Sequence, residues 1–324
     1  MRLRLVPEKT NIDFFKFARI TFGASVLAVV LSIAAWLLIG LNFGIDFRGG
    51  TTIRTESAQP VDVGAYRASV EALNLGQVSI SEVFDPSFRD DQHVAMIRIE
   101  AQQGQESATG EVIQAIEAAL LEVEPSIKFT SVESVGPKVS GELIQTAILA
   151  VVAAMGAILV YIWLRFEWQF AVGAIAALIH DVILTIGLFS LLQIRFDLAT
   201  IAALLTIVGY SINDTVVIFD RLRENLRKYK TTPLQEVMNL TTNETLSRTL
   251  MTSGTTLLAL IALLILGGDV IRGFIFAITW GIIVGTYSSV YVAKNVVLML
   301  GVKRDWSKPT DGGGAGTRFG DVDA

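Results

Sequence analysis

Six long apolar stretches constrain the fold of this chain more than any other feature of its sequence. They lie at about 20–41, 143–164, 169–192, 198–219, 249–267 and 273–300. A helix needs roughly 20 mostly apolar residues to cross a bilayer, and each stretch is about that long. Of the 324 residues, 52% are hydrophobic and only 18% are charged, which is more apolar than a soluble domain requires. The sequence therefore predicts a membrane α-helical protein with six transmembrane helices.

The first stretch resembles a signal peptide because Lys9, Lys16 and Arg19 precede it. The residues that follow it, from Leu41 to Gly44, offer no small-residue cleavage site. We therefore expect an uncleaved membrane anchor at 20–41.

The positions of lysine and arginine predict the orientation, because short cytoplasmic loops hold an excess of both. Segment 220–248, between the fourth and fifth stretches, contains Arg221, Arg223, Arg227, Lys228, Lys230 and Arg248. The short loops on the other side hold only Arg195 and Arg272. This bias predicts that 220–248, the N-terminal segment 1–19 and the tail 301–324 are cytoplasmic. The tail is rich in glycine beyond Pro309 and is expected to be flexible.

Segment 42–142, between the first two helices, is too long and too patterned for a loop. It is expected to form an extracytoplasmic, periplasmic α+β domain. Strand-like runs and helices with one apolar face alternate in the order β-α-β-β-α-β, which is the ferredoxin-like pattern. The strands are expected at 51–56, 77–84, 93–100 and 126–132, and the helices at 61–74 and around 112–120. Residues 143–300 then form a five-helix membrane segment.

Segment 220–248 also contains a helix start. Thr232 is a candidate N-cap, Pro233 fits the first helical position, and Gln235 completes a capping box. The residues Leu234, Val237, Met238 and Thr241 share one face of that helix. We expect an amphipathic helix along the inner membrane surface, and a docking helix for a partner is the alternative.

Several function classes are excluded by what the sequence lacks. The chain has no cysteine and only two histidines, His93 and His180, so it can form no disulfide and has few ligands for a metal site. Its net charge of −5 gives no reason to expect nucleic acid as a partner. It contains no Walker motif, no His-Glu-x-x-His and no Gly-x-Ser-x-Gly. We therefore expect neither a cofactor nor an enzyme, and an ion gradient is the remaining energy source.

Ionisable side chains within the apolar stretches are the candidates for chemistry, because such groups are costly in hydrocarbon. Lys294 and Arg248 lie near helix ends, where long side chains can reach the interface. Asp181, next to His180, and Asp214 lie deeper, and a short carboxylate cannot reach water from there. Each carboxylate is either a structural contact between helices or a site that takes up and releases a proton, and the second alternative is favoured.

Small and polar residues around these carboxylates support a packed transport core. Thr206, Gly209, Tyr210, Asn213 and Asp214 are predicted to cluster on one side of the fourth helix. The sixth helix has small residues at four-residue steps, Gly281, Gly285 and Ser289, a spacing that lets another helix approach closely.

Three segments resemble signatures of the SecD/SecF family of bacterial protein-export subunits, and specifically its SecF members. The first is 43–51, FGIDFRGGT, which contains Asp46, Arg48, Gly49 and Gly50 at the start of the outer domain. The others are 209–221, GYSINDTVVIFDR, and 247–256, SRTLMTSGTT. Residues 179–182, IHDV, are also similar to the family. The resemblance spans nearly the whole chain except the tail.

The resemblance implies a subunit in the bacterial inner membrane that pairs with SecD in a unit of the resistance-nodulation-division superfamily. Such a pair works with the SecYEG channel and uses the proton-motive force, without ATP, to draw a polypeptide outward after SecA has driven its entry. Carried over by motif, Asp214 would bind the proton, Arg248 would be its charged partner, and Asn213 belongs to the same motif. Asp181 and His180 are relay candidates of second rank.

Two other functions stay open at this stage. The chain could be a scaffold that only stabilises SecD or the channel, with its buried charges holding helices together. It could also be half of a proton-driven exporter of small molecules or lipids from the same superfamily, which predicts an apolar pocket in the outer domain.

Overall fold

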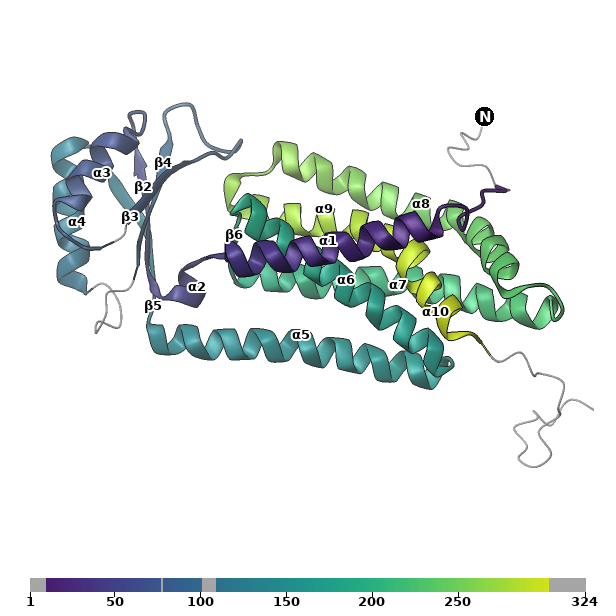
Figure 1. The fold of residues 1–324 in the computed structure, drawn as a ribbon. Helices are drawn as coiled ribbons and strands as arrows, with labels where there is room; N and C mark the ends of the chain where they lie inside the picture. Colours follow the sequence, from purple (N-terminus) through teal and green to yellow (C-terminus); the bar gives the residue numbers. More distant parts are fainter. Residues whose placement is uncertain (1–9, 77, 101–108, 303–324) are drawn as a thin grey trace, which may run out of the picture.

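The structure is a computed structural model that describes residues 10–76, 78–100 and 109–302. Within these residues six helices are long and apolar enough to cross a membrane, as the sequence predicted. They form one elongated bundle, and a small α/β domain extends from one end of it (Figure 1). The spans are α1 (Ala18–Leu38), α5 (Pro137–Arg165), α6 (Trp168–Leu192), α7 (Leu198–Lys228), α8 (Leu234–Leu266) and a sixth span made of α9 (Asp269–Ser288), a π-helical turn η1 (Ser289–Ala293) and α10 (Lys294–Leu300).

The outer domain has the predicted ferredoxin-like order. Its elements are β2 (Gly50–Ser57), α3 (Val63–Glu71), β3 (Val78–Val83), β4 (His93–Glu100), α4 (Gly110–Val123) and β5 (Lys128–Val135). The sheet order is β3-β4-β2-β5, and every neighbouring pair is antiparallel. Helices α3 and α4 both lie on the face of the sheet turned away from the bundle (Figure 1).

The hydrophobic core of the outer domain lies between the sheet and these two helices. Ile53 and Ile97 from the central strands are fully buried against Val70, Ile116 and Leu120 of the helices. Because side chains alternate between the faces of a strand, the residues beside Ile53 on β2 face the other way, toward the bundle. The last strand differs from the prediction, since β5 begins at Lys128 and runs to Val135, with a register shift opposite Arg54 and Thr55.

A short junction ties the outer domain to the bundle. The strand β1 (Asn42–Phe43) pairs in parallel with β6 (Arg195–Phe196), and the one-turn helix α2 (Ile45–Arg48) follows. Gly49 and Gly50 then adopt φ values of 74° and 136°, which favour glycine, so this pair turns the chain into β2. Asp46 accepts a hydrogen bond from the backbone N–H of Leu198 at 3.1 Å and thereby caps the start of α7. Gly49 and Gly50 therefore have a structural role, because they form the turn that connects the bundle to the outer domain.

A second contact joins the hairpin between β3 and β4 to the loop between α8 and α9. The N–H of Phe84 donates to Oδ2 of Asp269, and the N–H of Asp269 donates to the carbonyl of Phe84, both at 2.9 Å. The outer domain is therefore attached to the bundle at two separated points.

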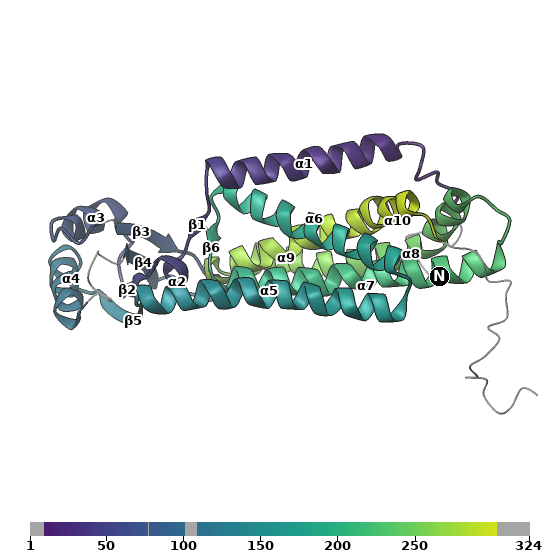
Figure 2. The ribbon, with the colours of Figure 1, turned by 60° about the horizontal axis from the view of Figure 1, so that its bottom comes forward.

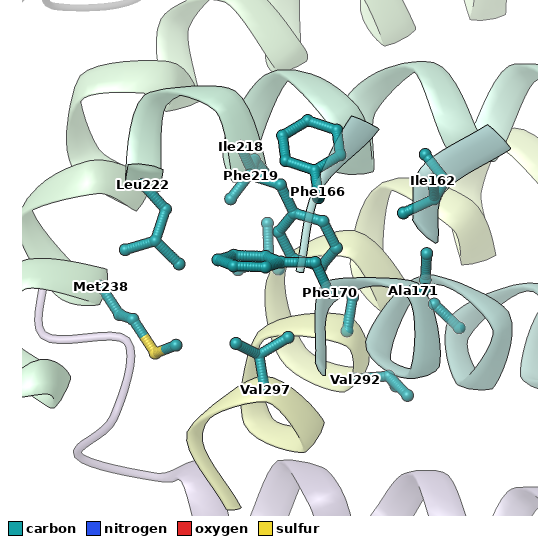
Figure 3. Close-up of a cluster of buried hydrophobic side chains, with 14 of the residues drawn as sticks. Ile162, Phe166, Phe170, Ala171, Ile218, Phe219, Leu222, Met238, Val292 and Val297 are labelled. Carbon is teal, nitrogen blue, oxygen red and sulfur yellow. The ribbon is translucent and has the colours of Figure 1, made fainter. Parts of the chain in front are cut away.

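Aromatic side chains pack in the core of the bundle where α5 ends and α6 begins (Figure 3). The rings of Phe170 and Phe219 meet edge to face with centroids 5.0 Å apart, and Phe166 packs beside both. A Cβ at Gly173 would lie 2.8 Å from the carbonyl oxygen of Ala293, so this glycine lets α6 approach the sixth span closely. Helices α1 and α5 lie along opposite sides of the bundle (Figure 2).

The prediction of an amphipathic helix along the inner membrane surface is wrong. Residues 234–248 are the first part of α8, which continues without a break to Leu266, and Pro233 is the N-cap, one position later than predicted. The apolar face that includes Val237 and Met238 is buried within the protein. The N-terminal segment lies against α8, where Asn243 exchanges two 2.8 Å hydrogen bonds with the backbone of Ile12. The predicted flexible tail lies outside the described residues, as do residues 1–9.

Candidate functional site in the helix bundle

Asp181 is the centre of a polar cluster that joins three helices. Its side chain on α6 is fully buried, at 0% exposure. Oδ2 accepts hydrogen bonds from the hydroxyls of Ser211 on α7 at 2.6 Å and Ser288 on α9 at 2.8 Å. Oδ1 lies 3.0 Å from Nδ1 of the neighbouring His180. Three short polar contacts hold this carboxyl group in one position.

The glycines of α9 explain how the helices come close enough for this cluster. A Cβ added to Gly285 would lie 3.1 Å from the Ser211 side chain and 3.5 Å from Oδ2 of Asp181. A Cβ added to Gly281 would overlap the side chain of Ile207. Ser289, the third residue of this series, is fully buried in the π-helical turn and donates to the carbonyl of Thr286. Small residues thus line the contact between α7 and α9.

Asp214 lies on α7 one turn beyond Ser211 and is 4% exposed. Its one side-chain hydrogen bond among the described residues is long, 3.4 Å from the Ser253 hydroxyl on α8. Ser253 in turn lies 2.7 Å from the Thr286 hydroxyl on α9. Asp214 is therefore held more loosely than Asp181, in a second polar cluster that spans α7, α8 and α9.

Arg248 lies on α8 near this second cluster. It is close enough to act electrostatically on the Asp214 carboxyl group, but no ion pair within 4 Å joins the two in the part of the chain that the structure describes. The Arg248 side chain is exposed on the surface of the bundle. The structure therefore places Asp214 and Arg248 in one region of the bundle but without an ion pair between them.

Asn213 does not join Asp214. It is exposed on another side of α7, about 100° around the helix from Asp214, together with Thr206 and Gly209, so the predicted single polar face is divided in two. No described atom outside their own helices lies within 4 Å of a Cβ built at Gly209 on α7 or at Gly254 on α8. Polar and small groups exposed on membrane-spanning helices favour contact with another protein over contact with lipid.

His180 extends the Asp181 cluster toward α1. Its Nε2 atom is buried without a hydrogen-bond partner among the described residues, and its ring stacks on Tyr287 at 6.2 Å. The Tyr287 hydroxyl donates to the carbonyl of Thr21 at 2.8 Å and lies 3.0 Å from the Ser25 hydroxyl. The second-rank candidates thus belong to a network that reaches the first span.

The expectation that Lys294 reaches the membrane interface is wrong. This residue is 1% exposed, its Nζ donates to Thr242 Oγ1 at 3.1 Å, and it lies over the rings of Phe15 and Phe14 at 4.3 and 5.0 Å. The N-terminal segment covers it, and a sequence pattern cannot show that coverage. The hydroxyl partners were also missed as site residues, although Ser211 belongs to the second motif and Ser253 to the third. These partners are Ser211, Ser253, Thr286 and Ser288.

The spans, the outer domain after the first span and the carboxyl groups buried between helices define a multi-pass membrane protein. The membrane part contains both polar clusters, and the outer domain is attached at one end of it (Figure 1).

The chain belongs to the SecD/SecF family of protein export membrane proteins. The sequence model of the SecD/SecF C-terminal region matches residues 115–303, and that of the SecD/SecF GG motif matches residues 34–61. The curated relatives are SecF subunits of protein translocase. That of Cereibacter sphaeroides is 68% identical over 323 residues, which cover 100% of this chain and 99% of the relative. That of Rickettsia rickettsii is 41% identical over 310 residues, which cover 94% and 97%.

Solved structures of SecDF have the same fold. The crystal structure of the translocon-associated membrane protein SecDF from Thermus thermophilus matches with a TM-score of 0.80 and 36% identity. SecDF in the super-membrane-facing form matches with a TM-score of 0.68 and 38% identity. These matches cover 93% and 92% of this chain but only 40% of each SecDF chain.

Proposed function

We propose that this chain, the SecF subunit of a SecD/SecF protein translocase, uses the proton-motive force to promote late, ATP-independent movement of a polypeptide through the SecYEG channel. It acts after SecA on the same substrate and is a transport subunit rather than an enzyme. It lies in the bacterial inner membrane with both termini in the cytoplasm. The lysine and arginine bias of segment 220–248 supports this orientation.

The observation that carries the proposal is the difference between the two buried carboxyl groups. Asp181 accepts two hydroxyl hydrogen bonds shorter than 3 Å, whereas Asp214 accepts a single long one at 3.4 Å. A nearby guanidinium stabilises a charged carboxylate, and burial without it favours the neutral acid. Movement of α8 relative to α7 would bring Arg248 toward Asp214 or away from it, and each position would favour one charge state. Asp214 is thus the proton-binding group and Asp181 a positioning group.

The surface of the bundle supports a partner in the membrane. Asn213, Thr206 and Gly209 are exposed on α7, and Arg248 is exposed on the neighbouring α8. A second membrane subunit that covers this face would shield these groups from lipid and complete the site. The relatives named SecDF support SecD as that subunit.

The test is to measure protein export driven by an imposed proton gradient in vesicles that contain the Asp214→Asn variant, SecD and SecYEG. Asparagine keeps the size and the hydrogen bond of the side chain but cannot change charge, so we expect assembly with SecD to persist and gradient-driven export to be lost. Asp220→Asn is the matched control, because Asp220 lies on the same helix but is exposed and paired with Arg165 at 2.9 Å.

Two other outcomes decide between the functions that the sequence left open. Full export by Asp214→Asn would identify a scaffold in which the buried charges only hold helices together. Proton-driven efflux of a small molecule without any effect on export would identify an exporter. Arg248→Met is expected to lose export as Asp214→Asn does, because the charged state of the carboxyl group would then have no partner.

A further inference from the structure

Two arginines lie close together where the outer domain meets the bundle. Arg98 lies on β4 of the domain, and Arg195 lies on β6, at the outer end of the α6 span. The Nε atom of each is buried and has no hydrogen-bond partner among the described residues. Neither forms an ion pair in this part of the chain. Both side chains are half-buried, and a buried Nε–H group without an acceptor is costly, so this pair favours an anionic partner.

The two guanidinium groups converge on one atom. Nη2 of Arg98 lies 2.7 Å from Sδ of Met96, and Nη1 of Arg195 lies 4.0 Å from the same sulfur. A thioether is a weak acceptor and cannot neutralise either charge. Burial first, and the charge of Arg195 second, lower the pKa of Arg98 to about 10, and the charge of Asp197 opposes this shift. The like charges of these two half-buried side chains therefore oppose each other.

The carboxylates nearby are already engaged by other groups. Asp197 accepts from the N–H of Thr200 at 3.0 Å, and Asp46 accepts from the N–H of Leu198, so both cap α7. Asp269 accepts from the N–H of Phe84 and pairs with Arg272. Glu82 and Glu133 line the same cavity as well, but both are exposed to solvent. Arg98 and Arg195 thus have no carboxylate at ion-pair distance among the described residues, and Asp197 attracts Arg98 only from farther away.

Both arginines line a cavity of about 770 Å³ between the open face of the sheet and the end of the bundle. The wall on the sheet side is polar, whereas Leu264, Val270 and Phe274 from α8 and α9 form apolar surface on the bundle side. Val270 is 60% exposed in the first turn of α9, so this side of the cavity lies at the outer end of the sixth span. Carboxylates line this cavity as well, but Arg98 and Arg195 offer Nε atoms without acceptors beside the apolar surface. This arrangement fits the phosphate and the acyl chains of a phospholipid.

We propose that Arg98 and Arg195 bind the phosphate of an anionic phospholipid from the leaflet nearest the outer domain. The two guanidinium groups donate charge-assisted hydrogen bonds to the phosphate oxygens, which offsets the repulsion between the two charges and ties the domain to the membrane surface. The acyl chains lie against the apolar wall. The site takes a phosphate-bearing ligand, and a lipid rather than free phosphate is its source because of this wall.

The experiment measures thermal unfolding of the delipidated full-length chain in neutral detergent with added phosphatidylglycerol, phosphatidylcholine or inorganic phosphate. We expect phosphatidylglycerol to raise the unfolding temperature at lower concentration than phosphatidylcholine. Stabilisation by inorganic phosphate equal to that by phosphatidylglycerol would overturn the lipid assignment in favour of the free ion. Equal effects of the two lipids would overturn the preference for an anionic lipid. Both comparisons use the unmodified protein.

Variants then locate the site. Arg98→Gln and Arg195→Gln should each bind phosphatidylglycerol about tenfold more weakly, because each loses a charge-assisted hydrogen bond. Arg54→Gln removes the same charge from the same cavity wall, but Arg54 stacks over Phe88, so this variant should bind like the parent. Without lipid, Arg98→Gln should unfold at an equal or higher temperature than the parent. An equal loss of lipid binding in Arg54→Gln would reduce the site to general attraction of charge and overturn the proposal.

Discussion

At the residue scale, Gly281 marks the closest approach of α7 and α9. A side chain at this position would overlap Ile207, whereas a Cβ at Gly156 on α5 meets no described atom within 4 Å. We predict that Gly281→Val lowers the free energy of unfolding by about 1–3 kcal/mol, the usual cost of overpacking. Gly156→Val should have little effect. Thermal unfolding of the two variants in detergent is the measurement, and equal losses would show that the α7–α9 contact is not the reason.

The pKa values of two carboxyl groups in the outer domain predict how the stability of the domain depends on pH. Hydrogen bonds from the side chain and the backbone of Ser87 lower the pKa of Asp85 from 3.8, and those of Ser126 lower the pKa of Glu124 from 4.5. Because the folded-state pKa values lie below the ordinary ones, this stabilisation is present above about pH 4.5 and is lost as the pH falls through the folded values.

Urea unfolding of the full-length chain can be followed by a fluorophore on Gln114→Cys. The urea concentration at the unfolding midpoint should decrease as the pH is lowered from about 5 to about 3. The double variant Asp85→Asn, Glu124→Gln should show a shallower fall. The absence of cysteine from the chain makes a single label specific. A pH profile identical to the parent's would assign the acid sensitivity to other carboxylates.

The candidate site was partly predictable from single residues. Asp181 and Asp214 could be identified because a carboxylate in an apolar stretch has no ordinary explanation. Their partners Ser211 and Ser288 could not, because a serine within a helix can also bond to the carbonyl one turn back, as Ser288 does to Gly285. Asn213 was placed at the site through its motif, but a one-residue step turns a helix by about 100° and directs it outward.

At the element scale, the sixth span contains a feature that its apolar pattern did not predict. The π-helical turn Ser289–Ala293 separates α9 from α10 and adds a residue to one turn. The turn comes directly before Lys294, whose side chain is buried beneath the N-terminal segment. A π turn and an apolar α-helix have the same composition, so only the tertiary contacts distinguish them.

The burial of Lys294 leads to a prediction with opposite signs for two variants. Its ammonium group is held by Thr242 and two aromatic rings, with no carboxylate within 4 Å among the described residues. Lys294→Met, which replaces the buried cation by an apolar side chain of similar length, should leave stability unchanged or raise it by about 1–4 kcal/mol. Lys294→Glu should lower it by about 3 kcal/mol or more, because a carboxylate meets the negative faces of the rings.

Thermal unfolding measures this difference, and limited proteolysis of the N-terminal segment shows its cause. The segment should become sensitive in Lys294→Glu and stay protected in Lys294→Met. Destabilisation by both variants to the same degree would show instead that the hydrogen bond to Thr242 is the essential contact.

At the scale of the whole molecule, the orientation in the membrane is open to a direct test. Gln114 is exposed on α4 of the outer domain, and Lys228 is exposed at the end of α7 farthest from it. In intact cells, a cysteine at Gln114 should react with a thiol reagent that cannot cross the membrane, whereas a cysteine at Lys228 should react only after the cells are broken. The reverse pattern would contradict a cytoplasmic position for both termini.

The sequence by itself determined the spans, the ferredoxin-like order of the outer domain and the family. Hydrophobic length and local periodicity depend on neighbours in the chain, and motifs are local by definition. Only the tertiary structure decided that α8 is a single helix, that Asp181 is tightly held and Asp214 loosely, and that Arg98 faces Arg195. These features depend on contacts between residues far apart in the chain, such as the N-terminal segment with α8 and β4 with β6. No local pattern encodes which distant side chain will cover or neutralise a given group.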